Sequence, residues 1–178
     1  MSYQTVQDIK CKLADAGRLD GEGSLLNKSA YELPDGTTVE VDGVFASACV
    51  DLLFDPDQYG LENLDGGLGD MLTKSINMCD NDLKPDLYKN IVLSGGSTMI
   101  KGFSERVRSE VEKGAGGAAL AVVPDSNGIE PGYNIQRKIG AWIGGSILAS
   151  LDTFSKISVS KQDYEDSGAS NIVHRTVT

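Results

Sequence analysis

The sequence predicts a mixed fold of helices and strands, of the α/β or α+β class. Short strand-like runs such as Ile91–Leu93 alternate with segments whose apolar residues recur at helical spacing, such as Phe103–Lys113. The chain has 178 residues, of which 40% are hydrophobic. That length corresponds to about one domain, or a compact pair, and the composition is that of a chain with a sizeable core.

The first elements are expected to be a helix and a hairpin. Val6, Ile9 and Leu13 fall on one face of a short amphipathic helix. The runs Tyr31–Leu33 and Thr38–Val41 flank the turn sequence Pro-Asp-Gly. This order predicts strand, turn and strand.

The middle of the chain carries two helical patterns. Cys49–Phe54 is a short apolar run that fits either a helix or a strand. Leucine, methionine and isoleucine residues keep helical spacing over residues 61–76. Gly66 and Gly67 interrupt that pattern and weaken the prediction of a helix in its first half.

The last third is predicted to hold one strand and one helix. Leu120–Val123 is a strand-like run, and Asp125–Tyr133 is a loop with Asn-Gly and Pro-Gly turn signals. Trp142–Leu151 carries an apolar stripe at helical spacing. After Phe154 we expect a short extended piece and a polar tail.

Composition excludes several functional classes. The net charge of −10 disfavours binding to nucleic acid and to anionic membranes. Cys11, Cys49 and Cys79 are far apart and His174 is the only histidine, so a zinc site is not expected. We expect reduced thiols in the cytosol or nucleus. The longest apolar stretch, Ala141–Leu151, is too short to span a bilayer.

A glycine turn follows the predicted strand, in the sequence NIVLSGGSTMIKG at Asn90–Gly102. The phosphate-binding P-loop pattern fails because Lys101 comes one place too early. The dinucleotide pattern fails because Gly95 and Gly96 are adjacent. Without Cβ atoms these glycines allow a ligand or another backbone to come close. From these residues alone a plain tight turn is the favoured interpretation.

Two acids resemble the start of a calcium loop. Asp80 and Asp82 have the spacing of its first two ligands. Pro85 and Ile91 then stand where that loop needs glycine and glutamate. We therefore interpret the acids as a solvated helix N-terminus.

Longer strings carry a family resemblance. The sequence WIGGSILASL at Trp142–Leu151, together with VLSGG at Val92–Gly96, resembles actin. The other matching strings are YELPDG at Tyr31–Gly36, DLY at Asp86–Tyr88, SKQDYEDSG at Ser160–Gly168 and IVHR at Ile172–Arg175. They follow the order of actin and nearly its spacing, from about Val6 to the end of the chain.

The resemblance implies an α/β fold of the actin-like ATPase (ribonuclease H-like) class, present in part. Residues 1–56 resemble part of subdomain 4, residues 57–139 most of subdomain 3, and residues 140–178 the C-terminal segment of subdomain 1. The N-terminal half of actin, with its phosphate-binding hairpins, metal-coordinating aspartate and water-positioning residue, has no counterpart. We therefore expect a truncated or split form that has no ATPase activity by itself, with Mg only when the missing half is present.

The same resemblance implies an adenosine-side site for ATP or ADP. The matching positions are Lys10, Gly95, Gly96, Met99, Ile100 and Lys138. Ile100 stands where actin has a tyrosine beside the adenine, and Cys11 where it has a glutamate. The alternative, that Lys10 and Lys138 are simply solvated, stays open.

The resemblance also implies a partner-binding wall. Its residues match those of an apolar cleft in which partners of actin insert a helix: Ile143, Ile147, Leu148, Leu151 and Ile157. Core packing is the alternative for some of them. The chain departs from actin in its longer, Gly-rich segment 113–139, in Ser158, which replaces a tryptophan, and in its last three residues.

Three functions follow as expectations. The first is a cytoskeletal actin-like protein that assembles into or attaches to filaments, in the cytoplasm or nucleus. The second is a non-hydrolysing, actin-related scaffold subunit of a larger complex. The third, a sugar kinase or chaperone-like ATPase of the wider superfamily, is the weakest, because fold analogy alone does not give function. Expected partners are actin or actin-like chains and actin-binding proteins, with no nucleic acid and no membrane.

Overall fold

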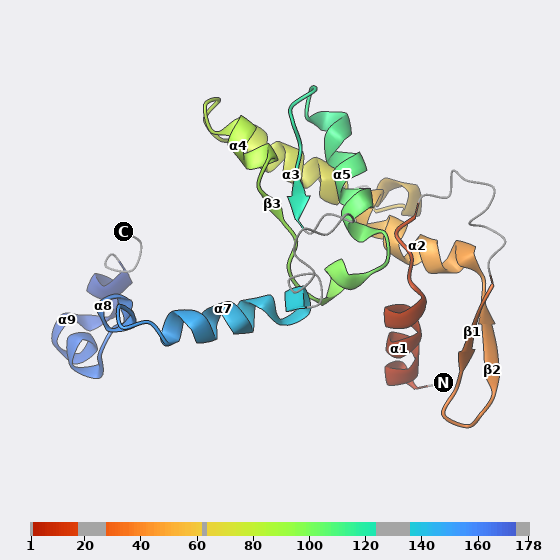
Figure 1. The fold of residues 1–178 in the computed structure, drawn as a ribbon, viewed down its shortest axis with the longest axis horizontal. Coiled ribbons are helices and arrows are strands. Elements are labelled where there is room, and N and C mark those ends of the chain that lie inside the picture. The colour runs from red at the N-terminus through yellow and green to blue at the C-terminus, as the bar shows by residue number, and fades with distance from the viewer. Residues whose placement is uncertain (1, 18–27, 62–63, 124–135, 174–178) are drawn as a thin grey trace. The chain divides into compact units, whose positions relative to one another are not determined.

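The computed structural model describes residues 2–17, 28–61, 64–123 and 136–173 (Figure 1). The chain divides into two units, Met1–Lys138 and Ile139–Thr178. Each unit is described by itself below. In the part of the chain that the structure describes, no helix is long and apolar enough to cross a membrane.

The first unit begins with the predicted helix and hairpin. Helix α1 spans Tyr3–Leu13, and the side chain of Ser2 accepts the N–H of Thr5, as an N-cap does. Strands β1 (Ser29–Glu32) and β2 (Thr38–Val41) pair antiparallel. Both predictions are confirmed.

The hairpin is attached to α1 through one carboxylate. The hydroxyl of Tyr31 on β1 donates to Asp8 on α1. The Nζ atom of Lys12 lies 2.9 Å from the same carboxylate and 5.1 Å from the centre of the Tyr31 ring. Both contacts lower the pKa of the Asp8 carboxyl. The hydrogen bond from Tyr31 has the larger effect, and the contact with Lys12 the smaller one.

Helix α2 spans Gly43–Phe54, so the ambiguous run at its end is helical. The expected helix over residues 61–76 is wrong in its first half: α3 spans only Leu68–Asn77. Gly66 has a φ of +87°, which a helix does not tolerate. A Cβ atom on Gly67 would lie 1.8 Å from the carbonyl oxygen of Phe54. The glycines therefore turn the chain against the end of α2 before α3 begins.

Helices α3 and α5 (Phe103–Gly114) pack closely through small residues. A Cβ atom on Gly69 of α3 would lie 2.6 Å from the Cβ of Glu110 on α5. A Cβ atom on Gly114 of α5 would lie 2.7 Å from Cγ2 of Thr73 on α3. Glycine on each helix thus allows a contact that a larger residue would prevent.

A two-stranded parallel sheet follows α4 (Lys84–Tyr88). Strand β3 spans Ile91–Val92 and pairs with β4 at Val122–Val123. Both predicted strands are confirmed, although each is shorter than its apolar run. The expected loop at 125–133 lies outside the described residues.

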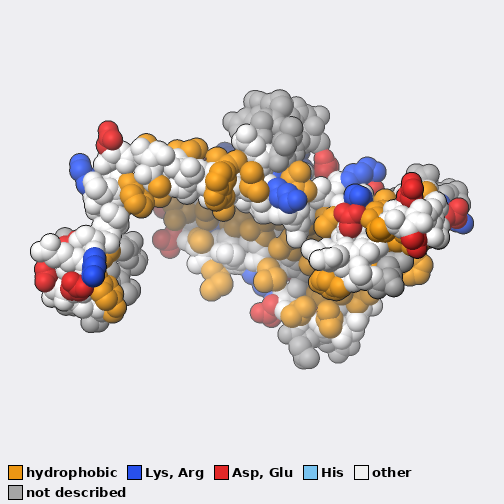
Figure 2. Space-filling view, turned by 90° about the horizontal axis from the view of Figure 1, so that it is seen from below, with side chains coloured by type: hydrophobic (Ala, Val, Ile, Leu, Met, Phe, Trp, Pro, Cys, Tyr) orange, Lys and Arg blue, Asp and Glu red, His pale blue; other side chains and the backbone are white. Residues whose placement is uncertain are grey.

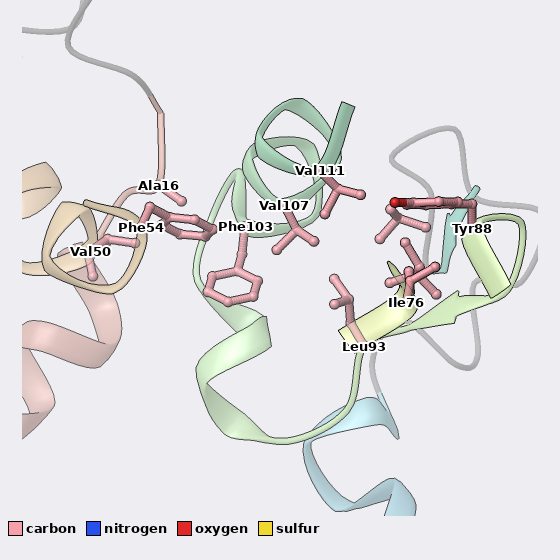
Figure 3. Packing of buried hydrophobic residues seen from close by; sticks show 12 residues of the cluster. Ala16, Val50, Phe54, Ile76, Tyr88, Leu93, Phe103, Val107 and Val111 are labelled. Carbon is pink, nitrogen blue, oxygen red and sulfur yellow. The ribbon is translucent and has the colours of Figure 1, made fainter. Parts of the chain in front are cut away.

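One hydrophobic cluster forms the core of the first unit (Figure 3). The rings of Phe54 and Phe103 lie 5.5 Å apart, and Val107 and Val111 of α5 point from the helix towards the strands. The cluster consists of Ala14, Ala16, Val50, Phe54, Ile76, Tyr88, Ile91, Leu93, Phe103, Val107, Val111 and Val122.

A buried ion network lies beside this core. Arg106 of α5 contacts Asp51 of α2 at 3.0 Å and Glu110 at 2.8 Å. Its guanidinium carbon also lies 5.1 Å from the centre of the Phe54 ring. Burial alone would raise the pKa of Glu110, but the bonds from Lys113 and Arg106 outweigh it and lower that pKa.

The second unit is helical. It holds α7 (Gly140–Ala149), α8 (Phe154–Ile157) and α9 (Lys161–Val173). The helix predicted around Trp142–Leu151 is confirmed. The expected extended piece directly after Phe154 is wrong, because α8 begins there, and the polar segment that follows is helical over Lys161–Val173.

The start of α9 shows why that segment is helical. The N–H of Asp163 donates to the hydroxyl of Ser160 at 3.1 Å, and the Asp163 carboxylate accepts the N–H of Ser160 at 3.3 Å. This reciprocal pair is a capping box, with aspartate in place of the usual glutamate. The signal was in the sequence as Ser-x-x-Asp.

Candidate functional site

The glycine turn has a conformation that only glycine adopts easily. Gly95 has a φ of +97°, and the 3-10 helix η2 then spans Gly96–Met99. Both the N–H and the hydroxyl of Thr98 donate to the carbonyl of Gly95, at 3.2 and 2.7 Å. A Cβ atom on Gly95 would meet nothing within 4 Å. The turn is therefore fixed from inside and open on its outer side.

Arg137 lies in the 3-10 helix η3 (Arg137–Ile139). It contacts the turn through both its backbone carbonyl and its side chain. Its carbonyl accepts the N–H of Gly95 at 2.9 Å and the hydroxyl of Ser94 at 3.5 Å. Its Nη2 atom donates to the carbonyl of Thr98 at 2.6 Å. Only 6% of its surface is exposed. The sequence reasoning missed Arg137, and its position directly before Lys138 is the signal that was available.

The positions matched by resemblance fall into two groups at this turn. Lys138 is exposed, and its Cγ atom lies 3.9 Å from where a Cβ on Gly96 would stand. Met99 is exposed at the end of the 3-10 turn, whereas Ile100 is half-buried and packs against the core. The structure therefore brings Gly95, Gly96, Met99 and Lys138 together on an open surface, and turns Ile100 partly away from it.

Lys10 lies on α1, whose end is joined to the segment after the turn. The N–H of Ala16 donates to the carbonyl of Lys101 at 2.8 Å, and Nζ of Lys101 lies 2.8 Å from Asp15. Burial would raise the pKa of Asp15, but the bonds from Lys101 and the N–H of Gly17 lower it. This junction places the C-terminal end of α1 beside the turn region. It does not bring Lys10 itself into contact with the glycines.

Among the described residues, two lysine side chains of the candidate site have no polar partner. Within residues 2–17, 28–61, 64–123 and 136–173, no hydrogen bond or ion pair engages the ammonium group of Lys10 or of Lys138. Cys11, beside Lys10, is a free and exposed thiol, as are the other two cysteines. The open glycine surface and the ammonium groups of these two lysines suit a polar or anionic ligand.

A separate apolar hollow lies elsewhere in the first unit. Its volume is about 270 Å³, and it lies between α2 and α3. Its lining residues are Leu52, Leu53, Pro56, Leu64, Asp65, Gly66, Leu68 and Met71. Because none of the matched site residues lines it, this hollow is distinct from the glycine turn.

The predicted partner wall lies in the second unit. Ile147 is 60% exposed, and Leu148, Leu151 and Ile157 are exposed as well, whereas Ile143 is half-buried. Hydrophobic side chains are visible along the helical rod on the left of Figure 2, which is α7. Hydrophobic residues lie on all sides of this helix, and such a helix is normally buried.

Comparison with known families supplies the remaining observation. The family model of actin, described simply as Actin, matches residues 3–178. The chain belongs to the actin family. The match and the mixed helices and strands agree with an α/β actin-like fold, as the sequence predicted. The subdomain boundaries at 56 and 139, and the roles of the nucleotide and partner residues, stay predictions.

Proposed function

We propose that this actin-family chain is a cytoskeletal protein that assembles into, or attaches to, actin-type filaments. The observation that carries the proposal is α7, an apolar helix whose hydrophobic residues are largely exposed. Exposed apolar area forgoes about 25 cal/mol per Å² of stabilisation. A large exposed apolar patch usually marks an interaction surface. Another actin-like chain is the partner that family membership favours.

The proposed wall comprises Ile143, Ile147, Leu148, Leu151 and Ile157. Four of its members are exposed, so a partner has apolar surface to cover. Ile143 is half-buried, so it is expected to contribute less than Ile147. A partner helix laid against such a wall would use the helix-in-groove mode.

The test of the filament proposal is co-sedimentation with actin filaments. The chain is expected to pellet with the filaments, and Ile147→Asp is expected to abolish this, because it places a charge in the apolar contact. Gln162→Asp, on the exposed surface of α9, is the matched control and is expected to pellet normally. Equal pelleting of both variants would contradict the proposal.

The alternative is a non-hydrolysing, actin-related scaffold subunit of a larger complex. The proposed nucleotide site favours it as a second candidate, since a nucleotide at the glycine turn would be contacted there from the nucleoside side. High-speed sedimentation of the chain alone and with actin separates the two functions. If the chain neither self-assembles nor attaches to filaments, and is recovered stably in a soluble multi-protein complex, the scaffold function is selected.

The nucleotide site is part of the same proposal. Lys10, Gly95, Gly96, Met99, Ile100 and Lys138 would contact the adenosine part of ATP or ADP. The open face of Gly95 and the ammonium groups of the two lysines, which have no polar partner among the described residues, suit that ligand. Ile100 is half-buried and aliphatic, so it offers the adenine no aromatic face.

The affinity of this site is expected to be weak. With nucleoside-side contacts only, we expect a dissociation constant on the order of millimolar, about 4 kcal/mol of binding free energy. NMR titration with adenosine and ATP should shift the amides of residues 95–100. Shifts centred elsewhere would reject the site, and a submicromolar constant would reject the half-site interpretation.

Hydrolysis by these 178 residues alone is not expected. Phosphoryl transfer depends on charge and positioning around the phosphates and their metal ion. The positions matched to actin here lie on the nucleoside side. Mg-dependent hydrolysis that follows the purified protein through chromatography would contradict this.

A further inference from the structure

We infer that Arg137 is a positioning residue of the candidate nucleotide site, one that fixes the glycine turn in its ligand-ready shape. The inference rests on the proposed function for its ligand, adenosine or an adenine nucleotide. Its structural basis is the double contact that Arg137 makes with the turn. Arg137 itself touches no proposed ligand group, so its role is to hold other residues in place.

The first contact is through the backbone. The carbonyl of Arg137 accepts the N–H of Gly95 at 2.9 Å, and the hydroxyl of Ser94 reaches the same oxygen at 3.5 Å. Gly95 is the residue with a φ of +97°, at which the chain leaves the strand direction. The hydrogen bond therefore fixes the turn at its most unusual backbone position.

The second contact is through the side chain. Nη2 of Arg137 donates to the carbonyl of Thr98 at 2.6 Å, near the other end of the turn. A charged donor forms a stronger hydrogen bond than a neutral one, and burial strengthens it further. Arg137 is 6% exposed, so water does not compete readily for either contact.

The two contacts bracket the short 3-10 turn. Thr98 closes it from within, because its N–H and hydroxyl both donate to the carbonyl of Gly95. Arg137 holds Gly95 with its carbonyl and Thr98 with its guanidinium. The intervening Gly96 and Ser97 are consequently fixed without being covered, since a Cβ on Gly96 would meet only Lys138, at 3.9 Å.

The same residue also places Lys138. Because Lys138 follows Arg137 directly, anchoring Arg137 to the turn sets where the next backbone unit lies. The stem of Lys138 then approaches Gly96 while its ammonium group has no polar partner among the described residues. A site held in its binding geometry before the ligand arrives binds better than one that must be ordered first.

Amide hydrogen exchange tests the positioning role without any ligand. In Arg137→Gln the amide of Gly95 is expected to exchange at least tenfold faster than in the wild type, and in Arg137→Lys by a smaller factor. Lysine keeps the charge and can reach one carbonyl, but it lacks the planar fork of arginine. Exchange at Val107 and Val111 in the core should change little. Unchanged exchange at Gly95 in both variants would overturn the inference.

Adenosine titration by NMR then tests the consequence for binding. We expect affinity to fall at least fivefold in Arg137→Gln, with partial rescue in Arg137→Lys. The matched control is Arg108→Gln, because Arg108 also donates to a backbone carbonyl, that of Leu120, but far from the turn in sequence. The control should bind as the wild type does.

The outcomes separate the two proposals. If the wild type shows no adenosine shifts at residues 95–100, the proposed nucleotide site fails while the exchange experiment still tests Arg137. If the wild type binds and Arg137→Gln binds equally well, the positioning role fails while the site stands. If Arg137→Gln does not fold, Arg137→Lys decides: wild-type exchange and wild-type affinity in that variant overturn the inference.

Discussion

The two units differ in what they do with their apolar residues. All of the buried hydrophobic residues in the described part of the chain lie between Ala14 and Val122, in the first unit. From Ile139 to Ala169 none of the described side chains is buried. Helix α7 is nevertheless rich in hydrophobic residues, whereas α5 carries only a stripe of them. A hydrophobic helix is therefore buried only where other elements of the chain pack against it.

Helix α5 shows what the facing layer provides. Its stripe of Phe103, Val107 and Val111 meets α2, α3 and the parallel strands, and every member is at most 4% exposed. On the polar side of α5, Arg106 forms an ion pair with Asp51 of α2. For α7, the described residues provide no such facing layer. We therefore propose that a partner chain covers this helix.

The largest expected effect comes from deleting a core ring. Phe103→Ala should lower the free energy of unfolding by about 3–5 kcal/mol, because it removes a buried ring and leaves a cavity. Ile147→Ala should change it by less than about 0.5 kcal/mol, as for other exposed positions. Urea unfolding followed by circular dichroism measures both. Equal losses would show that α7 is part of the same core.

Glycine substitutions in the two units are also expected to have opposite effects on stability. Gly69→Ala should destabilise the first unit by about 1–3 kcal/mol, because its Cβ would lie 2.6 Å from that of Glu110 and force α3 and α5 apart. Gly144→Ala, in open space on α7, should increase helix stability by up to about 1 kcal/mol. Thermal unfolding and far-UV circular dichroism report the two. A stabilising Gly69→Ala would contradict the close approach of the two helices.

Acid should affect the first unit through Glu110. Burial alone would raise its pKa, but the bonds from Lys113 and Arg106 lower that pKa below its ordinary value of 4.5. Because the pKa of Glu110 is lower in the folded state than in the unfolded state, its ionised form stabilises the fold above the unfolded-state pKa. This contribution is lost as pH falls through the folded-state pKa. Urea unfolding between pH 7 and pH 3 should therefore show a shallower loss in Glu110→Gln. Glu105→Gln, exposed on the same helix, should follow the wild type.

The smallest effect is expected at the cap of α9. Ser160→Ala removes the hydroxyl that accepts the N–H of Asp163, and should cost about 0.5–1 kcal/mol of local helix stability. Helicity measured by carbon chemical shifts should fall over residues 161–168. Stability of the first unit should not change, and a loss there would show that α9 supports the core.

Local signals predicted most of the secondary structure. Spacing at Val6, Ile9 and Leu13, and the Pro-Asp-Gly turn, were sufficient for α1 and the hairpin. The pattern before Leu68 was misleading, because the need for φ above zero at Gly66 overrode helical spacing. Helix α9 was missed because its apolar pattern is weak, although its capping box was readable.

The candidate site was predictable in part. Resemblance supplied the glycines and Lys138, and the structure brings these together. It did not supply Arg137 itself, although Arg137 directly precedes Lys138, because the hydrogen bond from Arg137 to Thr98 joins residues 39 positions apart and cannot be read from local sequence. Lys10 depends on a contact of still longer range, that between Asp15 and Lys101.

The contacts around the glycine turn also bear on the order in which the chain folds. The ladder of β1 and β2 joins residues that are close in sequence, whereas Lys101 and Asp15 are separated by 86 positions. Closing a longer loop costs more chain entropy, and folding slows as such contacts come to dominate. The hairpin and the helices would therefore form early. The junction of Asp15 with Lys101, which brings the end of α1 to the segment after the turn, would be completed among the last steps.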